Sequence, residues 1–251
     1  MNKVKIFDAH LHIIDPRFPL IPNQGYLPPS FTASDYLESV ENFEVAGGAI
    51  VSGSFQGFDQ SYLLDALDTL GERFAGVTQL PSDTSDEEIL KLHEKGVRAV
   101  RFNVKRGGSE TIEQLDHFAR RVHDIAGWHA ELYIDSKDLE QLKETIERLP
   151  AVSIDHLGLS KQGLPDLLRL VEKGIKVKAT GFGRIDFDPA YAIRAVHEIN
   201  PGALLFGTDL PSTRAKTPFQ ESDAELIQET LGDKEAEKVL YRNAMKWYGI
   251  D

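Results

Sequence analysis

The sequence predicts one (β/α)8 TIM barrel that extends over residues 1–251. Eight short apolar runs rich in β-branched residues alternate with longer segments that have helical spacing and many charges. Strands that alternate with helices form parallel sheets through right-handed crossovers, and eight such units are the number that closes a barrel. An open doubly wound sheet is the alternative, but no G-x-G-x-x-G motif follows the first run. No low-complexity linker divides the chain, which suggests a single domain.

Each element can be assigned in order along the chain. The expected strands are 4–9, 48–52, 74–79, 97–103, 129–134, 151–156, 175–180 and 203–208. The expected helices are 34–46, 60–70, 86–95, 111–126, 137–149, 164–172 and 189–198, followed by 222–231 and 234–247. The segment 16–29 contains five prolines and no helical period. Since it follows the first strand, we expect it to form a loop over the barrel mouth.

The composition excludes several classes of function. A formal net charge of −12 disfavours general binding to nucleic acid or to an acidic membrane surface. The chain has no cysteine, which excludes disulfides, thiolate metal sites and a cysteine nucleophile. No stretch resembles a signal peptide or a membrane span, so we expect a soluble, cytoplasmic protein. A small anionic substrate remains compatible with these data, because a pocket can be locally basic.

Histidines and aspartates follow three of the expected strands, at the end of a barrel where active sites lie. The first strand ends in Asp8-Ala9-His10-Leu11-His12, and simple alternation puts Asp8, His10 and His12 on one face. His156 ends the sixth run and Asp209 follows the eighth. This set suits hydrolysis, in which a carboxylate takes a proton from water and imidazoles, or a metal that they hold, polarise a carbonyl group. The structural alternatives are a backbone hydrogen bond for His156 and a helix cap for Asp209.

Cationic side chains gather on the fourth and seventh strands. Arg101 lies within the fourth run, Arg106 follows it, and Arg184 follows the seventh run. An arginine that points into a barrel requires an anion, either a protein carboxylate or the carboxylate of a substrate. For Lys178 we expect a buried carboxylate partner such as Glu131.

Seven segments that span nearly the whole chain together resemble the amidohydrolase superfamily, in the branch that contains 2-pyrone-4,6-dicarboxylate lactonase and related lactonases. They are FDAHLH at 7–12, VRAVRFN at 97–103, WHAELY at 128–133, SIDHLG at 153–158, KATGFGRID at 178–186, LFGTDLP at 205–211 and RNAMKWYG at 242–249. The resemblance implies a hydrolase that opens a carboxylated cyclic ester. It implies that Asp209 is the general base and that His10, His12 and His156 line the carbonyl side. The substrate-binding residues that we expect are Arg101, Arg106, Arg184, Tyr133, Tyr26, Ser54 and Asn103.

Two metal states fit these residues. Many amidohydrolases carry a lysine or glutamate at the end of the fourth strand and a histidine at the end of the fifth, where this chain has Arg101 and Tyr133. A binuclear site would therefore lack its bridging ligand, and a nearby guanidinium disfavours any cation. We favour a metal-free site, as the resemblance to the dicarboxylate lactonases implies. The alternative is one divalent ion such as zinc, with the ligands His10, His12 and Asp209, with or without His156.

Two other functions fit the same motifs. A zinc-dependent, non-oxidative decarboxylase of the superfamily would share the H-x-H pair, the histidine of the sixth strand and the aspartate of the eighth. An inactive barrel that serves as a binding protein is the third hypothesis, and the intact His/Asp set argues against it. The expected partner is a small anionic cyclic substrate, and a homodimer is compatible with a barrel of this size.

Overall fold

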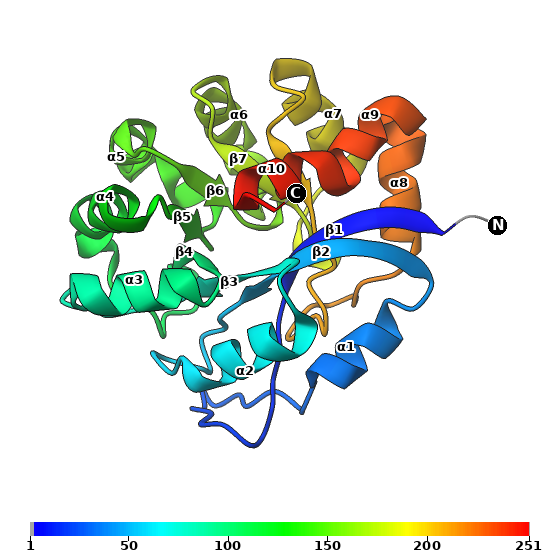
Figure 1. Ribbon diagram of the computed structural model, residues 1–251. Coiled ribbons are helices and arrows are strands. Elements are labelled where there is room, and N and C mark those ends of the chain that lie inside the picture. Colours follow the sequence, from blue (N-terminus) through cyan, green and yellow to red (C-terminus); the bar gives the residue numbers. More distant parts are fainter. Residues whose placement is uncertain (1–2, 251) are drawn as a thin grey trace.

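The computed structural model describes residues 3–250 and is a (β/α)8 barrel, which confirms the predicted fold (Figure 1). All seven strand pairs between β1 and β8 are parallel, and the strands follow one another in sequence order. Backbone hydrogen bonds link the ends of β8 and β1, from Asp209 N to His10 O at 2.7 Å and from His12 N to Leu210 O at 2.8 Å. The strands are β1 (Val4–Leu11), β2 (Phe43–Val51), β3 (Phe74–Thr78), β4 (Val97–Phe102), β5 (His129–Leu132), β6 (Val152–Ile154), β7 (Lys176–Ala179) and β8 (Leu204–Phe206).

Helices surround the strands, and α10 lies across one end of the barrel (Figure 1). No helix among residues 3–250 is long and apolar enough to cross a membrane. The helices are α1 (Ala33–Ser39), α2 (Ser61–Leu70), α3 (Asp86–Glu94), α4 (Leu115–Ala126), α5 (Lys143–Arg148), α6 (Leu164–Glu172), α7 (Pro189–Ile199), α8 (Ser222–Leu231), α9 (Asp233–Glu237) and α10 (Asn243–Tyr248).

The apolar core has two parts, because strands of a barrel are buried on both faces. Inside the barrel, small side chains such as Ala49, Ala75 and Ala99 form a cluster with Phe7. Tyr248 of α10 stacks on Phe7 with ring centroids 5.6 Å apart and belongs to the same cluster. A larger cluster of leucines, isoleucines, valines and aromatic residues lies between the strands and the helices.

Several of the predicted helices have different bounds in the structure, and the helices expected over 111–126 and 234–247 are each divided into shorter segments. The helix expected over 34–46 ends at Ser39, and β2 already begins at Phe43. Phe43 is buried and pairs with Val4 of β1, so sheet pairing overrides the helical spacing of this segment. The helix expected over 137–149 is divided into a 3-10 segment, Ser136–Gln141, and α5.

A bulge near the end of β1 determines where its side chains point. The β1–β2 register shifts between Asp8 and Leu11. Ala9 belongs to the cluster inside the barrel, whereas the carboxylate of Asp8 accepts a hydrogen bond from Tyr36 of α1 at 3.2 Å. A bulge breaks the alternation of a strand, so His10 points toward the barrel mouth and Asp8 does not. The expected common face for Asp8 and His10 is therefore wrong.

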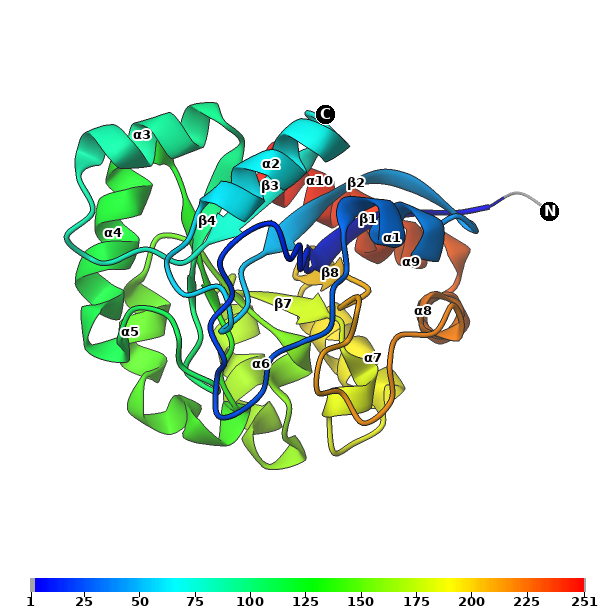
Figure 2. The same cartoon turned by 90° about the horizontal axis from the view of Figure 1, so that it is seen from below.

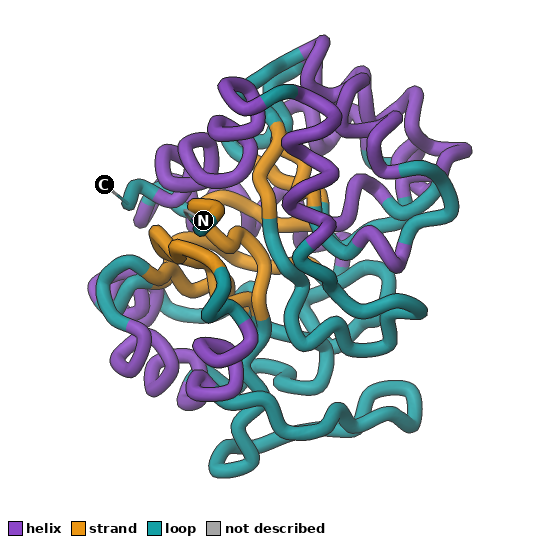
Figure 3. The backbone as a smooth tube through the Cα atoms, turned by 90° about the vertical axis from the view of Figure 1, so that its right-hand side faces the viewer, coloured by secondary structure: helices purple, strands orange, loops and turns teal. Residues whose placement is uncertain are grey.

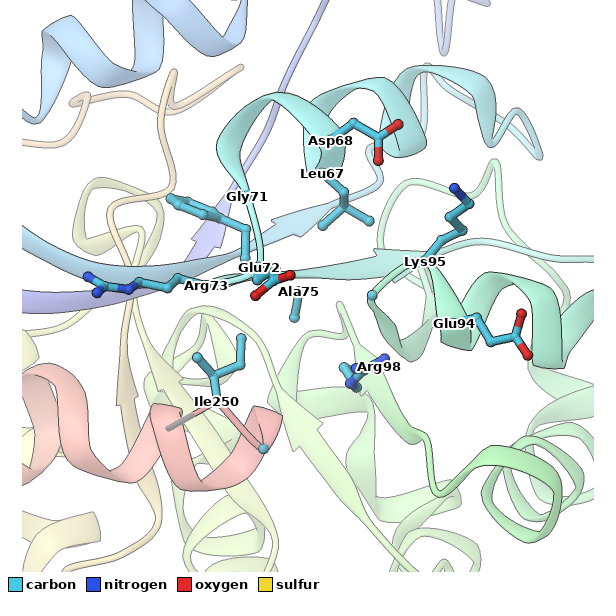
Figure 4. A pocket seen from close by; sticks show the side chains of 13 residues that line it. Leu67, Asp68, Gly71, Glu72, Arg73, Ala75, Glu94, Lys95, Arg98 and Ile250 are labelled. Atoms are coloured by element: carbon cyan, nitrogen blue, oxygen red, sulfur yellow. The ribbon is translucent and has the colours of Figure 1, made fainter.

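The two ends of the barrel carry different features. A cavity of about 700 Å³ lies at the N-terminal ends of β3 and β4, beside Glu72, Arg98 and Ile250 (Figure 4). The long loops lie together on another side of the molecule (Figure 3), and the loop over 16–29 crosses in front of the strands (Figure 2). Because active sites of barrels lie at the C-terminal ends of the strands, we expect the active site at the loop-covered end.

Candidate active site

A small polar cavity lies at the C-terminal ends of the strands. His10 is fully buried next to it, with its ring centroid 5.0 Å from that of His12 and 4.9 Å from that of His156. The structure thus brings together all of the site residues named from the sequence. Those that line the cavity are His12, His156, Asp209, Arg101, Arg106, Arg184, Tyr133, Tyr26, Ser54 and Asn103.

Two of these side chains are placed by unusual backbone conformations. Asp209 has a φ of 62° and His156 a φ of 52°, both in the left-handed region that non-glycine residues rarely adopt. The backbone hydrogen bond from Asp209 N to His10 O holds the first of these turns against β1. Such outliers persist only where the surrounding structure fixes them, and they cluster at functional sites.

Asp209 is a buried carboxylate with one oxygen already bound and one free. Arg184 Nε donates to Oδ2 at 2.5 Å, and Arg184 Nη2 donates to Thr213 O at 2.8 Å. Oδ1 has no hydrogen-bond partner among residues 3–250 and lies 3.9 Å from His10 Nε2 and 3.8 Å from His12 Nε2. Burial raises the pKa of Asp209, although the Arg184 charge opposes the shift. A carboxylate with a raised pKa and a free oxygen is suited to accept a proton.

The three histidines are uncharged at neutral pH. Burial lowers the pKa of His12 to about 3 and lowers the pKa values of His10 and His156 well below their usual range. His12 Nδ1 lies 2.7 Å from Val51 O, and since a carbonyl oxygen only accepts, Nδ1 carries the proton. Within the described part of the chain, His10 Nε2 and His156 Nδ1 have no hydrogen-bond partner. These two nitrogens are therefore available to a ligand.

A buried ionic cluster lies beneath the histidines. Lys178 Nζ donates to Glu131 Oε2 at 2.5 Å, as the sequence predicted, and lies 3.4 Å from His10 Nδ1. The other Glu131 oxygen accepts from Tyr248 OH at 2.5 Å and lies 3.0 Å from His129 Nε2. The Lys178 charge keeps the pKa of Glu131 below its usual range, although burial opposes this. The cluster connects the floor of the site to the C-terminal helix.

Arg101 has an internal carboxylate partner. Its Nη2 donates to Asp155 Oδ2 at 2.8 Å and its Nη1 donates to Ser52 O at 2.7 Å. The guanidinium carbon also lies 5.3 Å from the ring centroid of Tyr133. The sequence left two partners possible for Arg101, a protein carboxylate or a substrate carboxylate. In the structure, the partner is a protein carboxylate, that of Asp155. The sequence analysis did not name Asp155 as a site residue, although its position directly before His156, at the end of the sixth strand, indicates one.

Two groups of buried side chains could hold a divalent ion. Nitrogen and oxygen ligands without thiolates suit zinc, and the free atoms of His10 and Asp209 fit such a role. Arg184 and Arg101, however, already bind the second oxygens of Asp209 and Asp155, and their charges oppose a cation. Among the described residues, the two groups are His10, His12 and Asp209, and His10, Asp155 and His156.

Arg214 is a cavity residue that the sequence analysis missed. Its guanidinium lies 4.4 Å from the ring centroid of Tyr26 and donates to Asn23 O, both in the first loop. Asn23 Nδ2 in turn donates to Arg106 O at 3.2 Å. These contacts join three loops over a cavity of about 30 Å³, roughly the volume of one water molecule. The signal for Arg214 was a cation in the loop after β8, close to Asp209.

Comparisons with known proteins place this chain among lactone-hydrolysing relatives. It is 33% identical over 156 residues to 2-pyrone-4,6-dicarboxylate hydrolase of Comamonas testosteroni. The matched region covers 60% of this chain and 51% of that relative, so the chain spans about half of the relative's length. It is 28% identical over 242 residues to 4-sulfomuconolactone hydrolase of Rhizobium radiobacter, which covers 86% of this chain and 79% of the relative.

Solved structures share the fold. One is a probable 2-pyrone-4,6-dicarboxylic acid hydrolase from Acinetobacter baumannii, with a TM-score of 0.84, 22% identity and coverage of 98% of this chain and 99% of that one. Another is a putative 2-pyrone-4,6-dicarboxylic acid hydrolase from Pseudomonas putida, with a TM-score of 0.82, 23% identity and coverage of 97% of each chain. The amidohydrolase family model matches residues 7–250, nearly the whole sequence. The chain therefore belongs to the amidohydrolase family.

Proposed function

We propose that this protein is a hydrolase that opens a carboxylated lactone, with Asp209 as the base that activates water. The observation that carries the proposal is the free Oδ1 of Asp209, which lies beside two uncharged histidines in a cavity lined by arginines. The activities named for the curated relatives, which act on lactones with carboxylate or sulfonate groups, support the same class of substrate.

In the proposed reaction, Asp209 Oδ1 takes a proton from water while the water oxygen attacks the lactone carbonyl carbon. His10 Nε2 and His156 Nδ1 have no protein partner among residues 3–250, so an N–H at either position can donate to the developing oxyanion. When the tetrahedral intermediate collapses, the ring C–O bond breaks. The leaving ring oxygen takes the proton from Asp209, which restores the carboxylate and yields a hydroxy acid.

The arginines divide between two tasks in this proposal. Arg101 and Arg184 are anchored by protein carboxylates and supply positive charge near the reacting carbonyl. Arg106 and Arg214 have no carboxylate within 4.0 Å in the described part of the chain. We therefore assign the substrate carboxylate to Arg106 and Arg214 rather than to Arg101 and Arg184. A guanidinium binds a carboxylate through paired hydrogen bonds, which orients the ring as well as holding it.

Metal chemistry is not required by these steps. A divalent ion bound by His10, His12 and Asp209 would polarise the carbonyl and lower the pKa of water. The two anchored guanidinium groups nevertheless favour the metal-free state.

We infer that the first loop moves when the substrate enters. A cavity of about 30 Å³ is far smaller than a lactone ring, and the contact of Arg214 with Tyr26 forms part of its wall. We propose that this contact separates for binding and re-forms around the substrate, which would exclude bulk water during hydrolysis.

Hydrolysis of a panel of carboxylated lactones by the wild type and by Asp209→Asn tests the proposal. Removal of a general base lowers the rate by about 10²- to 10⁴-fold. Asp116→Asn, which changes an exposed carboxylate on α4, is the matched control and should retain the full rate. Full activity of Asp209→Asn on the best substrate would contradict the assignment of the base, and no hydrolysis of any lactone by the wild type would contradict the function.

A further inference from the structure

The two histidines of the H-x-H pair at the end of β1 are held by different groups. A neutral imidazole has one ring nitrogen that donates a hydrogen bond and one that accepts. His10 and His12 are both uncharged at neutral pH, because burial lowers the pKa of each ring. The partner of Nδ1 therefore decides whether Nε2 of the same ring donates or accepts.

The contacts of His12 leave an acceptor at its Nε2. Nδ1 lies 2.7 Å from Val51 O and carries the proton, since a carbonyl oxygen only accepts. Nε2 keeps its lone pair and lies 3.8 Å from Asp209 Oδ1, a second acceptor. One water oxygen at about 2.8 Å from each atom can donate to both. The cavity that His12 and Asp209 line has a volume of about 30 Å³, which is about that of one water molecule.

The contacts of His10 favour a donor at its Nε2 instead. Lys178 Nζ lies 3.4 Å from Nδ1, and an ammonium group donates hydrogen bonds but cannot accept them. Glu131, which binds Nζ at 2.5 Å, holds the ammonium group in this place. Asp155 Oδ1 lies 3.5 Å from the same Nδ1 but makes no hydrogen bond among residues 3–250. The contact with Lys178 therefore keeps the proton of His10 on Nε2.

We propose that His10 and His12 have opposite tautomers and opposite tasks in hydrolysis. His12 Nε2 accepts a hydrogen bond from the attacking water, whereas His10 Nε2–H donates to the oxyanion. Lys178 is the positioning residue that fixes the proton of His10. The inference rests on the proposed function and deepens it.

The acceptor on His12 complements the base. One proton of the water passes to Asp209 Oδ1 as the bond from oxygen to the carbonyl carbon forms, while the other stays on the oxygen and is hydrogen-bonded to His12 Nε2. Two acceptors turn a lone pair of the water toward the carbonyl carbon, which orients the nucleophile. When the ring C–O bond breaks, the proton on Asp209 moves to the leaving oxygen. The other proton remains on the new carboxylic acid group.

The same tautomers disfavour a bound metal ion. A histidine nitrogen must be free of its proton to bind a metal. Nε2 of His12 meets this condition and Nε2 of His10 does not, so the group of His10, His12 and Asp209 lacks one ligand.

Long-range ¹H–¹⁵N correlation spectra of protein labelled with ¹⁵N-histidine test the inference without any turnover. In a neutral ring, the nitrogen without a proton resonates far downfield of the nitrogen with one, so the spectrum identifies the tautomer. We expect Nδ1–H at His12 and Nε2–H at His10 in the wild type at neutral pH. The loss of one set of signals in His10→Asn, and of another in His12→Asn, assigns the two rings.

Lys178→Met should move the proton of His10, since Nδ1–H can then donate to Asp155 Oδ1. Lys176→Met is the matched control and should leave both rings unchanged, because Lys176 begins β7 and donates to Gly202 O. The same tautomer at both rings of the wild type, or a charged ring at either position, would refute the proposal whether or not Lys178→Met folds. An unaltered His10 spectrum in folded Lys178→Met would refute the role of Lys178.

The task of His12 is tested by kinetics on a carboxylated lactone. His12→Phe removes the acceptor, so kcat should fall by about 100-fold with little change in KM. His12→Gln offers an amide oxygen as acceptor and should restore most of this loss. Full kcat in His12→Phe would contradict the task of His12. Opposite tautomers in a protein that opens no lactone would sustain the tautomers and contradict the proposed function.

Discussion

Replacement of Lys178 by methionine should destabilise the protein strongly. Lys178 and Glu131 are both fully buried, and their charged atoms lie 2.5 Å apart. Methionine has a similar length and no charge, so Lys178→Met leaves the Glu131 carboxylate in the interior without its cation. Lys176→Met is the control on the same strand, because Lys176 has no carboxylate partner among residues 3–250; its Nζ donates to the carbonyl oxygen of Gly202 and lies 5.6 Å from the ring centroid of Trp247.

The magnitude follows from the geometry of the pair. At 2.5 Å and an effective dielectric constant of about 20, the Coulomb energy is about 7 kcal/mol, and desolvation of the two ions offsets much of it. Removing one partner of a buried ion pair costs about 3–5 kcal/mol. Glu131 retains contacts with Tyr248 and His129, so we expect about 3 kcal/mol for Lys178→Met and less than about 1 kcal/mol for Lys176→Met.

Urea unfolding at pH 7 of the wild type, Lys178→Met, Glu131→Gln and the double variant gives the free energies of unfolding. Because the double variant carries no charge at either position, it should recover part of the loss, with a coupling energy of about 2 kcal/mol or more. Additive effects, or a loss below about 1 kcal/mol in Lys178→Met, would show that the buried pair does not hold the cluster together.

Three further predictions concern the site and one helix end. Arg184→Met removes the charge that lowers the pKa of Asp209, so this pKa should rise further; since the base acts when deprotonated, the acidic limb of the kcat/KM profile should move to higher pH. Dialysis against a chelator should leave the rate of lactone opening unchanged, with elemental analysis as the check; loss of activity that zinc restores would contradict the metal-free proposal. Thr32→Ala should lower the unfolding free energy by about 1 kcal/mol, because Thr32 forms the capping box of α1 with Asp35; an unchanged urea midpoint would contradict this.

The sequence predicts most of the barrel because its strands are buried on both faces and are therefore continuous apolar runs. It also indicates the candidate site, since polar residues directly after such runs must lie at one end of the barrel. The start of β2 could not be predicted from an apolar run. Phe43 is placed by pairing with Val4, and a contact between residues so far apart in sequence is invisible to a local pattern.

Side-chain partners and directions were the least predictable features of the site. Arg101 and Asp155 are separated by 54 positions, so nothing in the local sequence identifies them as a pair. The bulge in β1 reverses the alternation of side chains between Asp8 and His10, and no residue type in that segment predicts a bulge. Arg214 lies in an irregular loop, where its contact with Tyr26 depends on how the first loop folds.

The hydrogen bonds that join the end of β8 to β1 have a consequence for how this protein is made. His10 lies in β1 and Asp209 follows β8, and Asp209 N donates a hydrogen bond to His10 O. During synthesis the aspartate is among the last parts of the barrel to leave the ribosome. If Asp209 is the base as proposed, a nascent or truncated chain that lacks β8 and the residues after it has no carboxylate to activate water, and catalysis begins only when the end of β8 has joined β1.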